Sequence, residues 1–198
     1  MAIRKKLDIK QLLKKKLSNS KVLQNLAYGS AKKKTDALRK EALGEFNKHV
    51  VTKELEKGNT GMGSALLGGR GNFFGFLGFN QGEQPLEIIR DAFENHVKIR
   101  NKKGKLKKAG PTSYLWEFDI SIPSKTEIYA VTPLSWSSGS WVKGVERGVT
   151  NYAKTIFRDS ERSRSGIALQ SKRNIGFITF RPTPYITPII NNLKKQLK

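Results

Sequence analysis

The chain has 198 residues and a formal net charge of +22, because 38 Lys and Arg stand against 16 Asp and Glu. Hydrophobic residues make up 37% of it and aromatic residues 9%, so there is enough apolar material for one packed domain, and we exclude wholesale disorder. The absence of cysteine excludes disulfides and thiolate chemistry, and two histidines leave little for a metal centre. So large a positive charge indicates an anionic partner.

The N-terminal region alternates leucines with lysine runs. This pattern predicts a short helix near residues 8–18 and another near 20–27, which together form a basic helical arm over residues 1–30. The region lacks the apolar core of a secretion signal, and the sequence contains no run of 18 apolar residues. We therefore expect a protein that is neither exported by an ordinary signal nor membrane-spanning.

The clearest helical periodicity follows this arm. Leu38, Ala42, Phe46 and Val50 recur every four residues, and Gly58 is a suitable stop signal after them. The spacing predicts a helix over residues 31–56.

Residues 61–79 combine seven glycines with five large apolar side chains. The glycines interrupt helix and strand periodicity alike, so we expect an extended glycine- and Phe-rich loop over residues 58–80. Side chains of this size are unfavourable in water, and we expect a second polypeptide to cover them. The predicted subunit-contact residues are Phe73, Phe74, Phe76, Leu77 and Phe79.

The middle of the chain predicts a helix, a basic loop and a strand. Pro85 suits the first position of a helix that ends near Ile99. Residues 98–108 carry seven cations without periodicity, which predicts an exposed basic hairpin or loop within residues 98–112. Strict alternation over residues 114–122 then predicts a half-buried strand that Pro123 stops.

The last third predicts further short elements. Ser124 and Glu127 fit a capping box that starts a helix through Ala130. We expect a turn and a strand over residues 136–145, a helix over 149–157, a strand over 175–180 and a terminal helix from Thr187. The expected fold is α+β, with residues 31–198 forming a single domain in which a small antiparallel sheet packs against helices.

The sequence offers no convincing catalytic constellation. The glycines around Arg70 have neither the lysine nor the preceding strand of a phosphate-binding loop. Glu117 and Asp119 share a strand face, but a solvated face explains them better than a carboxylate pair. His49 and His96 fall on amphipathic helices and are expected to be structural. We therefore predict a protein that is not an enzyme and that needs no cofactor or metal.

Three lysine-rich segments suit contact with a polyanion, because neutralising phosphates needs only clustered positive charge. Each of them also fits a solvated helix face or loop. The predicted polyanion-contact residues are Lys14, Lys15, Lys16, Lys32, Lys33, Lys34, Lys102, Lys103, Lys105, Lys107 and Lys108.

Four short segments, in this order along residues 31–198, resemble parts of a known protein class. They are Asn72-Phe73-Phe74-Gly75-Phe76-Leu77-Gly78-Phe79, residues 141–148 (WVKGVERG), residues 162–166 (RSRSG) and Pro184-Tyr185-Ile186-Thr187-Pro188. In these segments the chain resembles the head-to-tail joining (neck, tail-completion) proteins of tailed bacteriophages.

The resemblance implies a structural virion protein, assembled in the host cytoplasm, that joins the portal connector to the tail. Such proteins form homo-oligomeric rings, for which we expect a hexamer, and they contact neighbouring connector and tail proteins. Non-specific contact with DNA is compatible with the charge, and no membrane partner is expected.

Two other readings of the sequence stay open at this point. The charge also fits a non-enzymatic nucleic-acid-binding protein of ribosomal or nucleoid type. The basic amphipathic N-terminus and the Phe-rich loop also fit a peripheral membrane protein, which anionic vesicles would deplete from solution.

Overall fold

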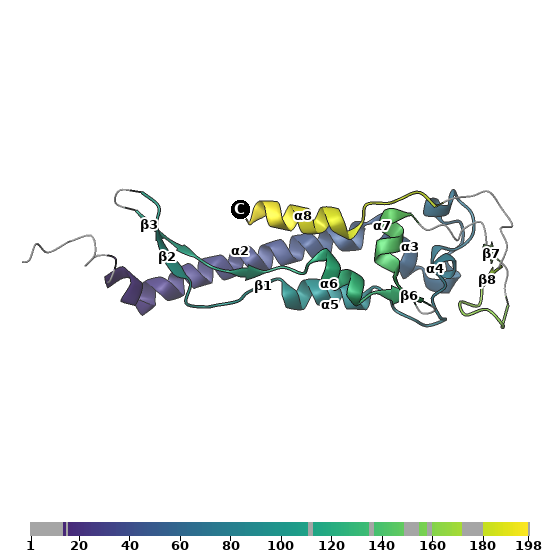
Figure 1. The fold of residues 1–198 in the computed structure, drawn as a ribbon, viewed down its shortest axis with the longest axis horizontal. Coiled ribbons are helices and arrows are strands. Elements are labelled where there is room, and N and C mark those ends of the chain that lie inside the picture. Colours follow the sequence, from purple (N-terminus) through teal and green to yellow (C-terminus); the bar gives the residue numbers. More distant parts are fainter. Residues whose placement is uncertain are drawn as a thin grey trace, which may run out of the picture. The chain divides into compact units, whose positions relative to one another are not determined.

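The computed structural model describes residues 14, 16–110, 113–134, 137–148, 155–157, 160–171 and 180–197. In these ranges the chain has the α+β fold expected from its sequence, with helices and two-stranded antiparallel sheets (Figure 1). It divides into two compact units, of which unit 1 comprises Met1–Ala37 and Val97–Ser121, and unit 2 comprises Leu38–His96 and Ile122–Lys198. This division differs from the boundary that we expected at residue 30.

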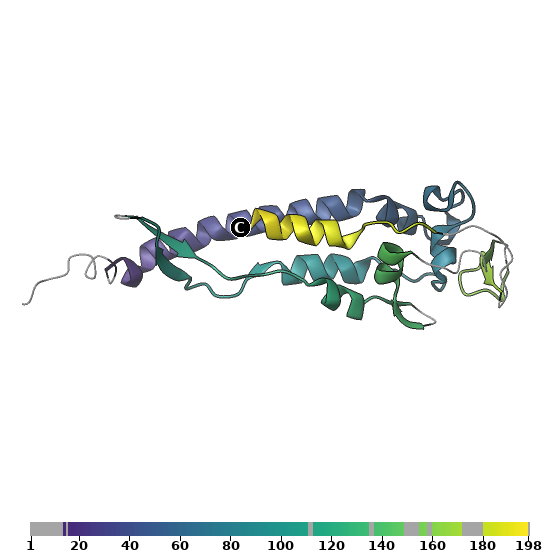
Figure 2. The same cartoon turned by 45° about the horizontal axis from the view of Figure 1, so that its top comes forward.

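Unit 1 combines the first part of the long helix α2 (Lys21–Lys48) with antiparallel strand pairs (Figure 2). Strand β2 (Lys105–Lys108) pairs with β3 (Tyr114–Glu117), and β1 (Lys98–Ile99) pairs with β4 (Ile120–Ser121). The predicted basic hairpin is therefore confirmed, and the strand predicted over residues 114–122 is present as β3 and β4.

Residues next to the strands of unit 1 contact α2. The rings of Tyr28 and Phe118 lie 6.1 Å apart, and the Gln24 side-chain amide donates to the Lys103 carbonyl at 2.6 Å. Gly104 turns the chain here with a φ of +59°, and a Cβ added to it would lie 2.8 Å from the Phe118 ring. A glycine is therefore required at this turn.

Unit 2 is built around the second part of α2, with helices α5 (Glu87–His96) and α8 (Ile186–Gln196) beside it. Phe46 of α2 is completely buried, and its ring lies 6.0 Å from Phe93 of α5. Helix α8 runs along α2, where Asn192 donates to Glu45 at 2.6 Å. The helix predicted after Pro85 and the terminal helix are both confirmed, with slightly different ends.

The helix predicted over residues 31–56 is interrupted at His49. Helix α2 ends at Lys48, and α3 (Val50–Glu56) starts after His49, whose backbone is extended. The His49 Nδ1 atom accepts from the Val51 amide at 3.2 Å, so that Nε2–H donates to the Pro184 carbonyl at 2.9 Å. Burial lowers the pKa of His49. The neutral ring therefore caps α3, and its role is structural, as expected.

The glycine- and Phe-rich segment is folded rather than extended. It contains two 3-10 turns, η1 (Gly58–Thr60) and η2 (Ala65–Leu67), and helix α4 (Phe73–Leu77). The Asn72 side chain caps α4 by accepting from the Gly75 amide at 2.7 Å, and Gly78 ends it with a φ of +75°. The glycines thus allow close turns instead of the extended loop that we expected.

The five predicted contact residues belong to the core of unit 2. Each is at most 2% exposed, and rings from distant segments cover them, with Phe180 lying 5.5 Å from Phe73 and Trp141 lying 5.7 Å from Phe79. The prediction of a subunit-contact loop was wrong, because the chain itself supplies the apolar cover that we had assigned to a second polypeptide. The residues that are core residues instead of subunit-contact residues are Phe73, Phe74, Phe76, Leu77 and Phe79.

The last third of the chain agrees only partly with prediction. Helix α6 (Lys125–Ala130) has the expected capping box of Ser124 and Glu127. Strand β6 (Ser137–Ser140) pairs with β5 (Pro133–Leu134). The residues after it form helix α7 (Trp141–Arg147) instead of a strand, because the Ser140 hydroxyl caps the Lys143 amide and the buried residues follow helical spacing.

The described part of the segment between α7 and α8 contains a further antiparallel strand pair. Strand β7 (Thr155–Phe157) pairs with β8 (Ala168–Gln170), which contradicts the predicted helix at residues 155–157. Residues 149–154 of that predicted helix and residues 175–179 of the predicted strand lie outside the described ranges.

Glu146 of α7 fixes the start of α8. Its carboxylate accepts from the Thr187 amide at 2.6 Å, the Thr187 hydroxyl at 2.8 Å, the Tyr185 amide at 3.2 Å and the Tyr129 hydroxyl. Burial alone would raise the pKa of Glu146, but these hydrogen bonds outweigh burial and hold the pKa below its ordinary value. A carboxylate at a helix N-terminus also interacts favourably with the helix dipole.

We expect Phe76→Ala to lower the free energy of unfolding by about 3–5 kcal/mol, because it removes a fully buried ring. Urea unfolding followed by circular dichroism measures the change. Met62→Ala is the control, since Met62 is 67% exposed and its change should stay within about 0.5 kcal/mol. Equal small effects in both variants would mean that the Phe-rich segment is not part of the core.

We expect Glu146→Gln to lower the free energy of unfolding by about 1–3 kcal/mol at pH 7, because the amide group cannot accept all four hydrogen bonds. The folded-state pKa of Glu146 lies below the ordinary 4.5, so this stabilisation is complete above pH 4.5 and is lost as the pH falls further. Urea titrations between pH 7 and pH 3 should therefore show that the free energies of unfolding of the wild type and the variant approach each other as the pH falls. A pH-independent difference would contradict this role.

Candidate polyanion-binding surface

The positive charge of the chain is concentrated in unit 1. Its two segments hold 18 Lys and Arg against 4 Asp and Glu, whereas the larger unit 2 holds 20 against 12. Opposite charges in unit 2 lie close enough to pair, as Arg90 does with Glu56 at 2.5 Å. Unit 1 therefore carries most of the electrostatic attraction that the chain exerts on an anion.

The predicted polyanion-contact lysines belong to unit 1 and are exposed. Chain folding brings the helix lysines, which include Lys32, Lys33 and Lys34, into the same unit as those of the hairpin. Lys15 lies outside the described residues. The exposed members of the predicted set are Lys14, Lys16, Lys32, Lys33, Lys34, Lys102, Lys103, Lys105, Lys107 and Lys108.

The β2–β3 hairpin presents one cationic face to solvent. Lys105 lies opposite Glu117 in the register, Lys107 lies opposite Leu115, and all four side chains are exposed. The other face carries Leu106 opposite Trp116, and both are half-buried. Leu106 and Trp116 are thus partly shielded from solvent, while Lys105 and Lys107 are exposed.

The acidic residues of the hairpin face lysines. Lys107 lies 2.7 Å from Glu117, and Lys105 lies 3.9 Å from Asp119. These pairs are exposed, so each contributes little to stability and leaves the lysines able to exchange partners.

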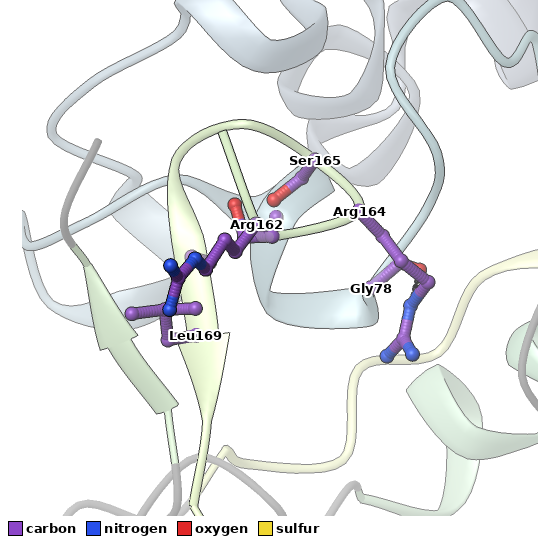
Figure 3. A pocket seen from close by; sticks show the side chains of 8 residues that line it. Gly78, Arg162, Arg164, Ser165 and Leu169 are labelled. Atoms are coloured by element: carbon purple, nitrogen blue, oxygen red, sulfur yellow. Dashed lines mark hydrogen bonds between the residues drawn. The ribbon is translucent and has the colours of Figure 1, made fainter. Parts of the chain in front are cut away.

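A second candidate site is a cavity of about 330 Å³ between α4 and β8 in unit 2, shown in Figure 3. Arg162 and Arg164 line it, but their guanidinium groups point in different directions. Arg164 donates to the Gly78 carbonyl at 3.4 Å, and the buried Ser165 hydroxyl accepts from the Ile167 amide at 3.5 Å. The two charges therefore do not converge on one anion. No pattern in residues 160–166 of the sequence indicates this cavity.

Neither a metal centre nor a membrane span is found among the described residues. No group of three or more His, Asp or Glu side chains there has the arrangement needed to hold a metal ion. In the same ranges, every helix is too short or too polar to cross a membrane. His96, the second histidine, is exposed at the end of α5.

We expect the combined change of Lys32, Lys33 and Lys34 to Gln to weaken binding to a duplex DNA probe and to make its salt dependence less steep. The slope of log affinity against log salt should fall by at most about 3, because each phosphate contact contributes about 0.9. Fluorescence anisotropy at several salt concentrations measures both. The control changes three exposed lysines of unit 2, Lys143, Lys194 and Lys195, to Gln; equal effects in the two variants would show that the attraction is not localised in unit 1.

The chain was compared with protein-family models, with curated proteins and with solved structures, and nothing in any of the three collections matches it.

Proposed function

We propose that this chain is a non-enzymatic structural protein of tailed-bacteriophage particles, of the class that joins heads to tails. The observation that supports the proposal is the packing of the four segments that carry the resemblance. They are far apart in the sequence, yet all four lie in unit 2, where the first, second and fourth segments bury aromatic side chains in one core and the third buries only Ser165. Because these segments contact one another, the resemblance extends to how the chain packs. Matches scattered over the surface would carry no such information.

The contacts between these segments are direct. Phe79 of the first segment lies 5.7 Å from Trp141 of the second, and Trp141 lies 6.1 Å from Tyr185 of the fourth. The Gln81 amide, just after the first segment, donates to the Arg164 carbonyl of the third at 2.9 Å. Glu146 of the second segment accepts from the start of the fourth. Each segment therefore depends on the others for its position.

The proposal needs contact surfaces other than the Phe-rich segment, because that segment is buried. Unit 1 supplies an exposed cationic surface suited to DNA or to acidic neighbouring proteins. A homo-oligomeric ring between connector and tail, with the virion as location, stays part of the proposal. In such a ring the unit 1 surfaces face other partners, since two of them repel each other.

A second candidate function is non-enzymatic binding of nucleic acid, of ribosomal or nucleoid type. It is favoured by the ratio of 18 basic to 4 acidic residues in unit 1. Phosphate binding of this kind weakens steeply with salt, whereas contacts that bury apolar surface persist. The salt dependence of association thus separates the two candidates.

We expect that a phage whose gene for this chain is deleted produces DNA-filled heads and separate tails, which electron micrographs would show. Supplying the chain in trans should restore joined particles. The chain should also stay with purified virions washed in about 1 M salt, where the Debye length is only about 3 Å. Joined, infectious particles without the chain would contradict the joining role, and release from nucleic acid by the same wash would favour the second candidate.

A further inference from the structure

Helix α2 presents an apolar face to solvent within unit 1. Val22 is 69% exposed, Leu23 is 41% exposed and Leu26 is 67% exposed. Spacings of three and four residues place side chains on the same side of a helix, so Val22 and Leu26 lie in one row with Leu23 beside them. Gly29, Ser30 and Lys33 continue that face toward the middle of the helix.

The opposite face of the same helix is already occupied. Gln24 donates to the hairpin carbonyl of Lys103, and the Tyr28 ring packs on Phe118. Thr35 follows on this face, is 3% exposed and donates to the Ala31 carbonyl at 2.8 Å. The contacts of the hairpin thus leave Val22, Leu23 and Leu26 outside the fold of unit 1.

We propose that this face of α2, made of Val22, Leu23, Leu26, Gly29, Ser30 and Lys33, binds an acidic amphipathic helix of a partner protein. The three aliphatic side chains provide the apolar contact, and the small residues Gly29 and Ser30 allow a helix to approach closely. Exposed cations border the face at both ends, with Lys21 before it and Lys32 and Lys34 on either side of Lys33 in the sequence. The inference rests on the proposed assembly role and states the chemistry of the neighbour.

Charge complementarity favours this occupant over a second copy of the chain. Two copies of unit 1, each with 18 basic and 4 acidic residues in its sequence, repel each other at close range. A helix rich in Glu and Asp with an apolar stripe satisfies both the lysines and the aliphatic side chains.

Duplex DNA and a membrane fit this face less well. DNA phosphates neutralise lysines but offer no apolar cover for Leu23 and Leu26. A membrane-surface helix has a continuous apolar stripe with bulky side chains, whereas this face changes to Gly29, Ser30 and Lys33 after two turns. The aromatic Tyr28 points to the opposite side.

The test measures binding of the purified full chain to a synthetic peptide with Leu at heptad positions a and d and mainly Glu elsewhere. A second peptide of equal charge has Ser in place of each Leu. Isothermal titration at physiological salt should show at least about tenfold tighter binding of the Leu peptide. Equal affinities for the two peptides would overturn the proposal, because charge alone would then explain the attraction.

A triple variant localises the contact. Val22→Gln, Leu23→Gln and Leu26→Gln together keep helix propensity, and they should abolish the preference for the Leu peptide while leaving duplex DNA affinity within about twofold. The matched control changes three exposed aliphatic residues of unit 2, Val50, Ile88 and Val131, to Gln and should keep the preference. An unchanged preference in the α2 variant would overturn the proposal.

Sedimentation with vesicles of anionic lipid tests the membrane alternative. The wild-type chain and the α2 variant should sediment equally, because only lysines then contribute. Loss of sedimentation in the α2 variant, with no peptide preference in the wild type, would assign the face to a membrane instead. None of these measurements uses phage particles, so their failure is distinguishable from failure of the joining role.

Discussion

The packing of Tyr185 is the interaction on which the rest of unit 2 depends. Its side chain is completely buried, its ring lies 5.7 Å from Phe46 and 6.1 Å from Trp141, and its hydroxyl bonds to Thr52 at 2.7 Å. Burial is the main reason why the pKa of Tyr185 is raised, so the hydroxyl keeps its proton and its hydrogen bond. One side chain thus joins the second part of α2, helix α3, helix α7 and the segment that leads into α8.

The two units differ in how much apolar surface they bury and how much charge they expose. Unit 2 buries large aromatic side chains such as Phe46, Phe79 and Trp141, so its cohesion comes from apolar area. In unit 1, Phe118 and the Lys103 carbonyl contact α2 through the Tyr28 ring and the Gln24 amide, while the described lysines are exposed. Unit 1 therefore stands to gain more stability from a bound anionic partner than unit 2 does.

Helices with regular apolar spacing were predictable from the sequence, as α5 and α8 show, because their burial follows from local periodicity. Helix α6 was predictable from its capping box of Ser124 and Glu127. The Phe-rich segment was not predictable. Its glycines indicate turns, but only the positions of Trp141 and Phe180 decide whether the rings are covered by the chain or by a neighbour. The interruption at His49 was missed for a similar reason, since its cap is completed by the distant Pro184 carbonyl. Tertiary contacts of this kind leave no local signal.

The candidate surface was predicted in part. Runs such as Lys32 to Lys34 identify exposed charge directly, because lysine side chains are rarely buried. Their union with the hairpin lysines in one unit, and the exposure of Val22 and Leu26, required the structure. In the sequence these aliphatic residues resemble core positions, and only the location of the hairpin shows which side of the helix remains open.

The late position of Tyr185 and α8 in the sequence has a consequence for synthesis on the ribosome. Phe46, Phe79 and Trp141 emerge well before the segment that covers them, so the aromatic centre of unit 2 stays incomplete until translation has passed Leu193. The nascent chain therefore carries uncovered rings beside highly charged lysine segments throughout most of its elongation. Chaperone engagement during translation would protect such a chain from premature association.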